Sequence, residues 1–126
     1  MVKKLDGAGT EKMATLQDAV VVAQRLHSII EQMALSVKKE QPTTVLGMQL
    51  RRAGVAIAGR LKGHFTAMSD LVTQMNLVAT RNGNDAVRVR SLRESVASLK
   101  TQLDIAMTKV KEHHSIDDAA ESTPPE

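Results

Sequence analysis

The chain has 126 residues, with 17 Lys and Arg against 14 Asp and Glu and a formal net charge of +3. It contains no Cys, Trp or Tyr and a single Phe, which excludes disulfides, thiolate nucleophiles and cysteine–zinc sites and removes the aromatic platforms on which single-stranded nucleic acids stack. Its longest apolar runs are a few residues, far short of the roughly 20 that span a bilayer, and residues 1–9 lack the apolar run of a signal peptide. We therefore expect one cytoplasmic or otherwise intracellular domain with no membrane span.

Charge is distributed unevenly along the chain. Between Lys38 and Lys100 there are eleven Lys or Arg and four acids, whereas the chain from Glu112 onward has five acids and no Lys or Arg. A basic middle with an acidic end is typical of ordinary surface charge, and it also suits an acidic partner or a tail that screens the basic surface.

The first helix is predicted over residues 11–39. Residues 1–10 contain two glycines and no periodicity, which is typical of a flexible leader. Thr10 can serve as an N-cap, and from Leu16 to Val37 apolar residues recur at every third or fourth position.

After Pro42, the same apolar spacing predicts one long helix over residues 43–80. A glycine inside a helix costs about 1 kcal/mol relative to alanine, so several of them need a reason. Ala56, Gly59 and Gly63 fall on one line outside the apolar stripe, while Gly47 and Gly54 lie on a separate line seven residues apart. The line through Gly59 indicates close packing of another backbone, either within the bundle or from a partner.

A third helix is predicted over residues 85–113. Gly83 suits the left-handed position that follows a helix, and Asn84 or Asp85 can cap the next one. The apolar positions then follow the strict 3-4 spacing of a coiled-coil seam, namely Val89, Leu92, Val96, Leu99 and Leu103. Basic residues flank this seam, so it favours a partner with acidic flanks, in this chain or in another.

These elements predict an all-α fold. Short joints between successive helices favour an elongated antiparallel three-helix bundle or coiled coil over residues 11–114. Residues 115–126 combine prolines, small residues and acids, which predicts a disordered acidic tail.

We find no pattern that predicts catalysis, a cofactor or a metal. In a three-helix bundle, His27 and His113 come within about one to two helical turns of each other. However, there is no Glu-x-x-His pair and no carboxylate on the seam to complete a ligand set. We therefore expect a protein that is not an enzyme.

One short stretch resembles a known family. Residues 58–63, Ala-Gly-Arg-Leu-Lys-Gly, are similar to the Ala-His-x-Leu-Lys-Gly core of histidine phosphotransfer domains, with Gly59 at the position of the phosphorylated histidine. This resemblance covers six of the 126 residues and would imply a domain that docks response regulators without carrying phosphate.

The sequence thus favours a helical protein–protein interaction module, a scaffold or adaptor that self-associates or forms a small subunit of a larger assembly. Its predicted contact surfaces are the line Ala56, Gly59 and Gly63 and the seam from Val89 to Leu103. The alternative is a basic helical subunit that binds RNA or a duplex backbone. Its polyanion contacts would be Arg51, Arg52, Arg60, Lys62, Arg88, Arg90 and Arg93.

Overall fold

The computed structural model describes residues 3–81 and 83–117. In chain order its elements are β1 (Lys3–Leu5), α1 (Gly7–Lys38), α2 (Thr44–Leu61), α3 (Thr66–Ala79), α4 (Asp85–His114) and β2 (Ser115–Asp117). Apart from the two three-residue strands, which pair antiparallel, the described chain is helical, and the predicted all-α class is confirmed.

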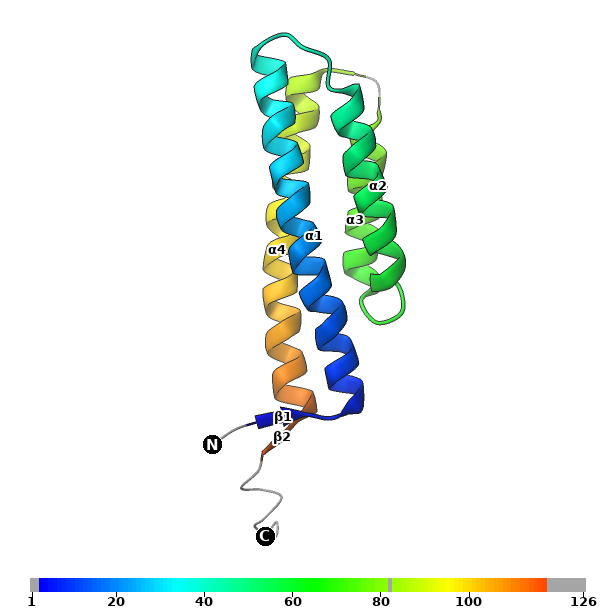
Figure 1. The fold of residues 1–126 in the computed structure, drawn as a ribbon, viewed down its shortest axis with the longest axis vertical. Helices are drawn as coiled ribbons and strands as arrows, with labels where there is room; N and C mark the ends of the chain where they lie inside the picture. Colours follow the sequence, from blue (N-terminus) through cyan, green and yellow to red (C-terminus); the bar gives the residue numbers. More distant parts are fainter. Residues whose placement is uncertain (1–2, 82, 118–126) are drawn as a thin grey trace.

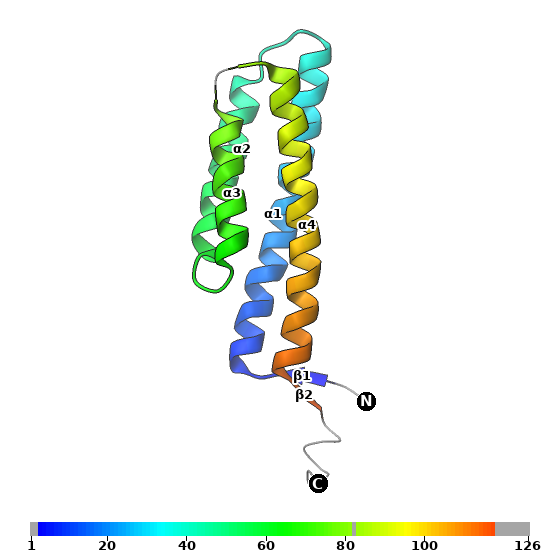
Figure 2. The ribbon, with the colours of Figure 1, turned by 180° about the vertical axis from the view of Figure 1, so that it is seen from behind.

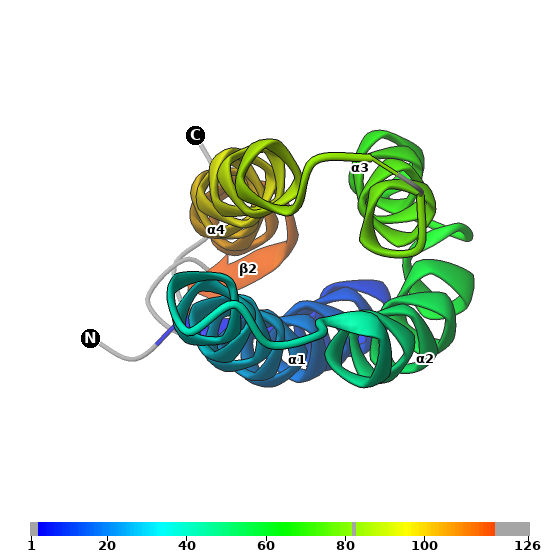
Figure 3. The same ribbon diagram turned by 90° about the horizontal axis from the view of Figure 1, so that it is seen from above.

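The helices form an elongated bundle in which each helix runs antiparallel to the one before it (Figure 1). The long helices α1 and α4 lie side by side over the length of the molecule, while α2 and α3 form a shorter hairpin against one part of this pair (Figure 2). Seen along the bundle axis, the four helices occupy four corners, with α2 diagonally opposite α4 (Figure 3). Beyond the tip of the hairpin, α1 and α4 continue as a two-helix pair that ends at β1 and β2 (Figure 1).

The expected single helix over residues 43–80 is wrong, because the chain turns back on itself at residues 62–65. The carbonyl of Leu61 accepts from the backbone N–H groups of His64 (3.2 Å) and Phe65 (2.7 Å), which closes α2, and α3 begins at Thr66. Unbroken, residues 43–80 would extend about 57 Å, against about 48 Å for α1. Folding back at Gly63 instead lets both halves of the apolar stripe pack against α1 and α4.

This hairpin changes the direction of the last helix. In a three-helix bundle the third helix runs parallel to the first, whereas with four helices in the described chain α4 runs antiparallel to α1. The proximity expected for His27 and His113 is therefore wrong. The C-terminal end of α4 instead meets the N-terminal end of α1, where the backbone N–H of Asp6 donates to the carbonyl of His114 (2.8 Å).

The first helix begins at Gly7, inside the stretch expected to be a flexible leader. Asp6 is its N-cap, and its carboxylate accepts from the backbone N–H of Gly9 (2.6 Å). Aspartate in this role satisfies one of the free N–H groups of the first turn, so Asp6 and not Thr10 sets the start of the helix. Lys3–Leu5 precede it as β1, and Ser115–Asp117, expected to begin the disordered tail, pair with them as β2. The rest of the predicted tail, residues 118–126, lies outside the described residues.

The core is aliphatic and methionine-rich. The largest fully buried side chains come from all four helices: Leu16, Leu26, Ile30, Met33, Leu50, Leu61, Val72, Met75, Leu92, Leu99 and Leu103. One buried hydroxyl ties the hairpin together, because Ser69 of α3 donates to the carbonyl of Ala58 of α2 (2.8 Å).

The joint before α4 follows the predicted pattern. Gly83 has a positive φ of 141°, a backbone conformation that suits glycine. The side chain of Asn84 accepts from the backbone N–H groups of Ala86 (2.8 Å) and Val87 (3.2 Å) and so caps α4. The prediction that Asn84 or Asp85 caps this helix is confirmed with Asn84.

The joint after α1 contains a residue with a strained backbone conformation. Glu40 has a φ of 57°, in the left-handed region that costs an L-residue roughly 1–2 kcal/mol. We expect Glu40→Gly to raise the free energy of unfolding by about 1 kcal/mol, because glycine carries no Cβ penalty there. Urea denaturation followed by circular dichroism measures the change. Glu40→Ala removes the same charge but keeps the Cβ, so an equal gain in that control would contradict the strain explanation.

Candidate functional site

One face of α2 turns away from the bundle. Its residues recur at helical spacing and are all exposed; we call them the α2 outer face, and they are Val45, Met48, Arg52, Val55, Ala56 and Gly59. Val45 is 67% exposed and Val55 is 55% exposed, although both are apolar. A Cβ added at Gly59 or at Gly63 would have no neighbour within 4 Å. Within the described chain, the predicted small-residue line is therefore open surface.

Close packing of α3 occurs at the other pair of glycines, which the sequence reasoning noted but did not use. A Cβ at Gly47 would overlap the backbone carbonyl of Ala79, and one at Gly54 would overlap the side-chain amide of Asn76. Both glycines are buried, and they let α3 lie directly against α2. Their seven-residue spacing was the available signal, since it places both on one side of the helix.

The predicted coiled-coil seam lies inside the bundle. Val89, Leu92, Val96, Leu99 and Leu103 are all buried, and α4 packs chiefly along α1. An ion pair flanks this contact, in which Arg93 donates to Glu31 of α1 through two nitrogens (2.7 and 2.8 Å). The same chain thus supplies one acidic partner for the seam, Glu31, whereas Asp18 of α1 pairs with Arg60 of α2.

The seven predicted polyanion contacts do not form one patch. Three are engaged in ion pairs, Arg60 with Asp18, Arg88 with Asp85 and Arg93 with Glu31. The other four, Arg51, Arg52, Lys62 and Arg90, form no ion pair among the described residues and are exposed. Of these, Arg90 is on α4, at the corner of the bundle opposite α2 (Figure 3). A phosphate backbone following α2 would therefore meet three basic residues without an ion pair among the described residues, Arg51, Arg52 and Lys62, and would miss the three on α4.

Two carboxyl groups have lowered pKa values. Hydrogen bonds from Arg93 hold the pKa of Glu31 below its ordinary value of 4.5, and the backbone N–H of Gly9 is the main cause that lowers the pKa of Asp6 below 3.8. The ion pair with Glu31 raises the pKa of Arg93. A carboxyl whose pKa is lower in the folded chain stabilises the fold above its unfolded pKa, and this stabilisation is lost as the pH falls through the folded value.

We therefore expect part of the stability to disappear below about pH 4.5, first through Glu31 and then through Asp6. Glu31→Gln should remove the first part of this loss and cost about 0.2–1 kcal/mol at neutral pH, the usual range for an exposed ion pair. Asp6→Asn keeps a good N-cap and removes only the charge. Thermal unfolding between pH 7 and pH 3 measures the effect, with Glu94→Gln as the matched control. Parallel pH profiles for Glu31→Gln and the native chain would contradict the assignment.

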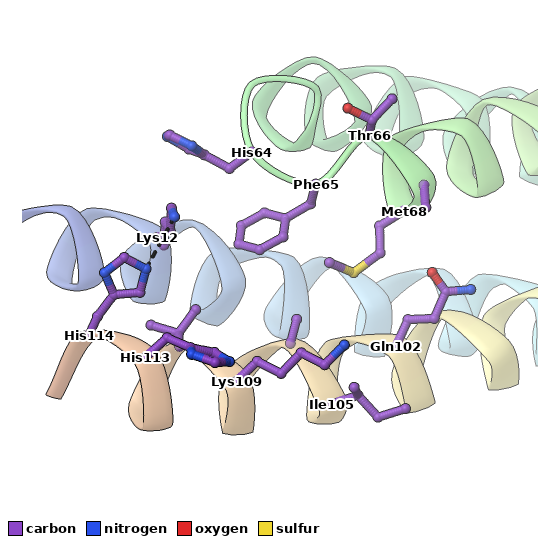
Figure 4. A pocket seen from close by; sticks show the side chains of 13 residues that line it. Lys12, His64, Phe65, Thr66, Met68, Gln102, Ile105, Lys109, His113 and His114 are labelled. Carbon is purple, nitrogen blue, oxygen red and sulfur yellow. Dashed lines mark hydrogen bonds between the residues drawn. The ribbon is translucent and has the colours of Figure 1, made fainter.

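A groove lies at the tip of the α2–α3 hairpin, where α1 and α4 continue alone. This hairpin-tip groove has a volume of about 530 Å³. Its walls are Lys12 of α1, residues 64–68 of the hairpin and the α4 residues Gln102, Ile105, Ala106, Lys109, Val110, His113 and His114. Figure 4 shows the Phe65 ring pointing from the hairpin toward α1, with Lys12 and His114 at one end of the groove.

A row of polar side chains in contact with one another lies at that end of the groove. Lys12 Nζ lies 3.2 Å from His114 Nε2, and His114 Nδ1 lies 3.3 Å from the Asp6 carboxylate. If Lys12 donates to Nε2, His114 is the neutral tautomer that donates from Nδ1 to Asp6. Sequence reasoning missed this site, because Lys12 and His114 meet only when α4 returns to the start of α1.

Within residues 3–81 and 83–117, no group of three or more His, Asp or Glu side chains has the arrangement to hold a metal ion. No helix there is both long and apolar enough to cross a membrane. The chain matches no family model, no curated protein and no solved structure.

Proposed function

We propose that this chain is a non-enzymatic helical interaction module that docks a helix of a partner protein on the α2 outer face, as a small subunit of a larger assembly. The observation that carries the proposal is the line of exposed apolar side chains on this face, continued by Ala56 and Gly59. Isolated exposed apolar residues are normal on protein surfaces, but exposed apolar residues that recur at helical spacing along one helix face are typical of helix docking.

The shape of the face suits a helix. Val45, Met48 and Val55 give apolar contacts along most of its length, and Ala56 and Gly59 leave its end flat. Small residues let two helix backbones approach closely, as Gly47 and Gly54 do on the buried side of α2. The open space around Gly59 is thus suited to a partner's side chains.

The positive charge of α2 indicates which kind of partner fits this face. Helix α2 contains Arg51, Arg52 and Arg60 and no acidic residue. Arg60 already pairs with Asp18, but Arg51 and Arg52 form no ion pair among the described residues. Two copies of α2 docked face to face would bring these arginines together, which is unfavourable. A helix from another protein, with an apolar stripe flanked by Asp or Glu, would pair with them.

The test uses two synthetic amphipathic helices with the same leucine and alanine stripe, one flanked by glutamates and one by lysines. We expect the glutamate peptide to bind and the lysine peptide to bind at least about tenfold more weakly in fluorescence anisotropy. Gly59→Leu should abolish binding and keep the fold, because the added side chain points into open space. Ala97→Leu, an exposed change on α4, is the matched control.

Equal binding of both peptides, or unchanged binding by Gly59→Leu, would overturn the proposal. Light scattering after gel filtration provides a second test of the charge argument. A dimer of the native chain that Gly59→Leu dissociates would show that a second copy, and not an acidic partner, covers this face.

A further inference from the structure

The hairpin-tip groove combines an apolar wall with basic groups. Phe65, Met68, Ile105, Ala106 and Val110 provide carbon surface, and none of the described residues that line the groove is acidic. The basic groups are Lys12, Lys109, His113 and His114, with His64 on the hairpin side. Among the described residues, the carboxylate that forms an ion pair with this set is that of Asp6, which contacts His114 through Nδ1 and lies outside the groove lining.

The shape of the groove fits a narrow ligand. Along α4 it extends from Gln102 to His114, which is about 18 Å at the rise of an α-helix. Its volume of about 530 Å³ falls within the range of small-molecule sites. A chain-like molecule with one charged end matches this length and width better than a compact polar one.

Little apolar surface is left there for a docking helix. Leu16 of α1 and Leu103 of α4 are already buried in the core. The apolar surface still open is small and is concentrated on Phe65 and on Ile105, which is 50% exposed. The groove therefore suits a single alkyl chain.

Basic donors are available for an anionic head. Lys109 makes no hydrogen bond or ion pair among the described residues, and Figure 4 shows its side chain lying along α4 beside the groove. Lys12 has one contact, the nitrogen of His114, and keeps further N–H donors free. Figure 4 places Lys12 beside His114 at one end of the groove, whereas the Lys109 side chain extends along α4 away from that end. Lys12 is therefore the donor placed to receive a carboxylate at that end.

We propose that the hairpin-tip groove binds a free fatty acid or a similar single-chain anionic amphiphile, with its carboxylate at Lys12 and its alkyl chain along Phe65, Met68 and Ile105. The groove shares no residue with the α2 outer face, so this site goes beyond the proposed function and each can fail alone.

Isothermal titration calorimetry with dodecanoate, below its micelle concentration, tests the proposal on the full chain. We expect one site for dodecanoate, at least about tenfold weaker binding of dodecylammonium and no binding of butyrate. Lys12→Ala should weaken dodecanoate binding by about tenfold, because a charge-assisted contact is lost. Lys111→Ala, at an exposed lysine of α4 outside the groove, is the matched control.

The apolar wall is tested separately. Ile105→Glu should abolish dodecanoate binding, whereas Val21→Glu, at an exposed valine of α1, should leave it unchanged. Circular dichroism of each variant shows that the fold is retained. Equal binding of dodecanoate and dodecylammonium, or equal effects of the two lysine variants, would overturn the proposal. Sedimentation with phosphatidylglycerol vesicles provides the last arm, since binding to vesicles without binding to dodecanoate would assign the charge to a membrane surface instead.

Discussion

Gly47→Ala is expected to destabilise the fold by about 1–3 kcal/mol, the usual cost of forcing extra atoms into a packed interior. The same substitution at Gly59 is expected to stabilise the fold by up to about 1 kcal/mol, the gain in helix propensity of alanine over glycine. Both glycines are in α2, and both changes add one methyl group. The opposite signs follow from their surroundings.

At Gly47 the added Cβ would overlap the backbone carbonyl of Ala79, so α3 would have to move away from α2. At Gly59 the added Cβ would meet nothing within 4 Å. Gly54 is an intermediate case, because the atoms that its Cβ would overlap belong to the side chain of Asn76. We expect Asn76→Ala to rescue part of the cost of Gly54→Ala, and a double-mutant cycle measures this coupling.

Urea denaturation monitored by far-ultraviolet circular dichroism gives the free energy of unfolding for each variant. Gly59→Ala serves as the control for the intrinsic effect of alanine in this helix. If Gly59→Ala destabilised the chain as much as Gly47→Ala, the helix face that contacts α3 would have to be the one through Gly59. The hairpin described here would then be contradicted.

Local signals in the sequence were enough to predict most helix ends. Pro42 and Asn84 act on residues next to them, so their effect could be read without knowing the fold. The turn at residues 62–65 was different. A continuous apolar stripe is compatible with one helix or with two halves folded against each other, and only the packing of both halves on α1 and α4 decides between them.

The positions of the candidate sites depend on whether residues 43–80 form one helix or a hairpin. Spacing showed that Ala56 and Gly59 share one line of α2 and that Gly47 and Gly54 share another, but not which line faces α3. The hairpin-tip groove was harder to predict from the sequence, since Lys12 and His114 are 102 positions apart. They meet because an even number of antiparallel helices returns the chain to its starting end, and a three-helix bundle would separate them by the length of the molecule.

The second large effect is expected in the seam of α4. Leu99 is 1% exposed, so Leu99→Ala should cost about 2–5 kcal/mol, the lost burial plus the cavity left behind. Ile105, on the same helix but 50% exposed, is the control, and Ile105→Ala should cost far less. Thermal unfolding of the two variants measures the difference.

The dependence of the unfolding midpoint on protein concentration shows whether this seam closes within one chain. A seam buried against α1 of the same chain gives an unfolding midpoint that does not depend on concentration, for the native chain and for Leu99→Ala alike. A seam shared between two chains would instead give a midpoint that rises with concentration, and Leu99→Ala would weaken association. Independence of concentration together with a large cost at Leu99 would place the seam inside one chain, so that partner and ligand binding should be sought on the α2 outer face and in the hairpin-tip groove.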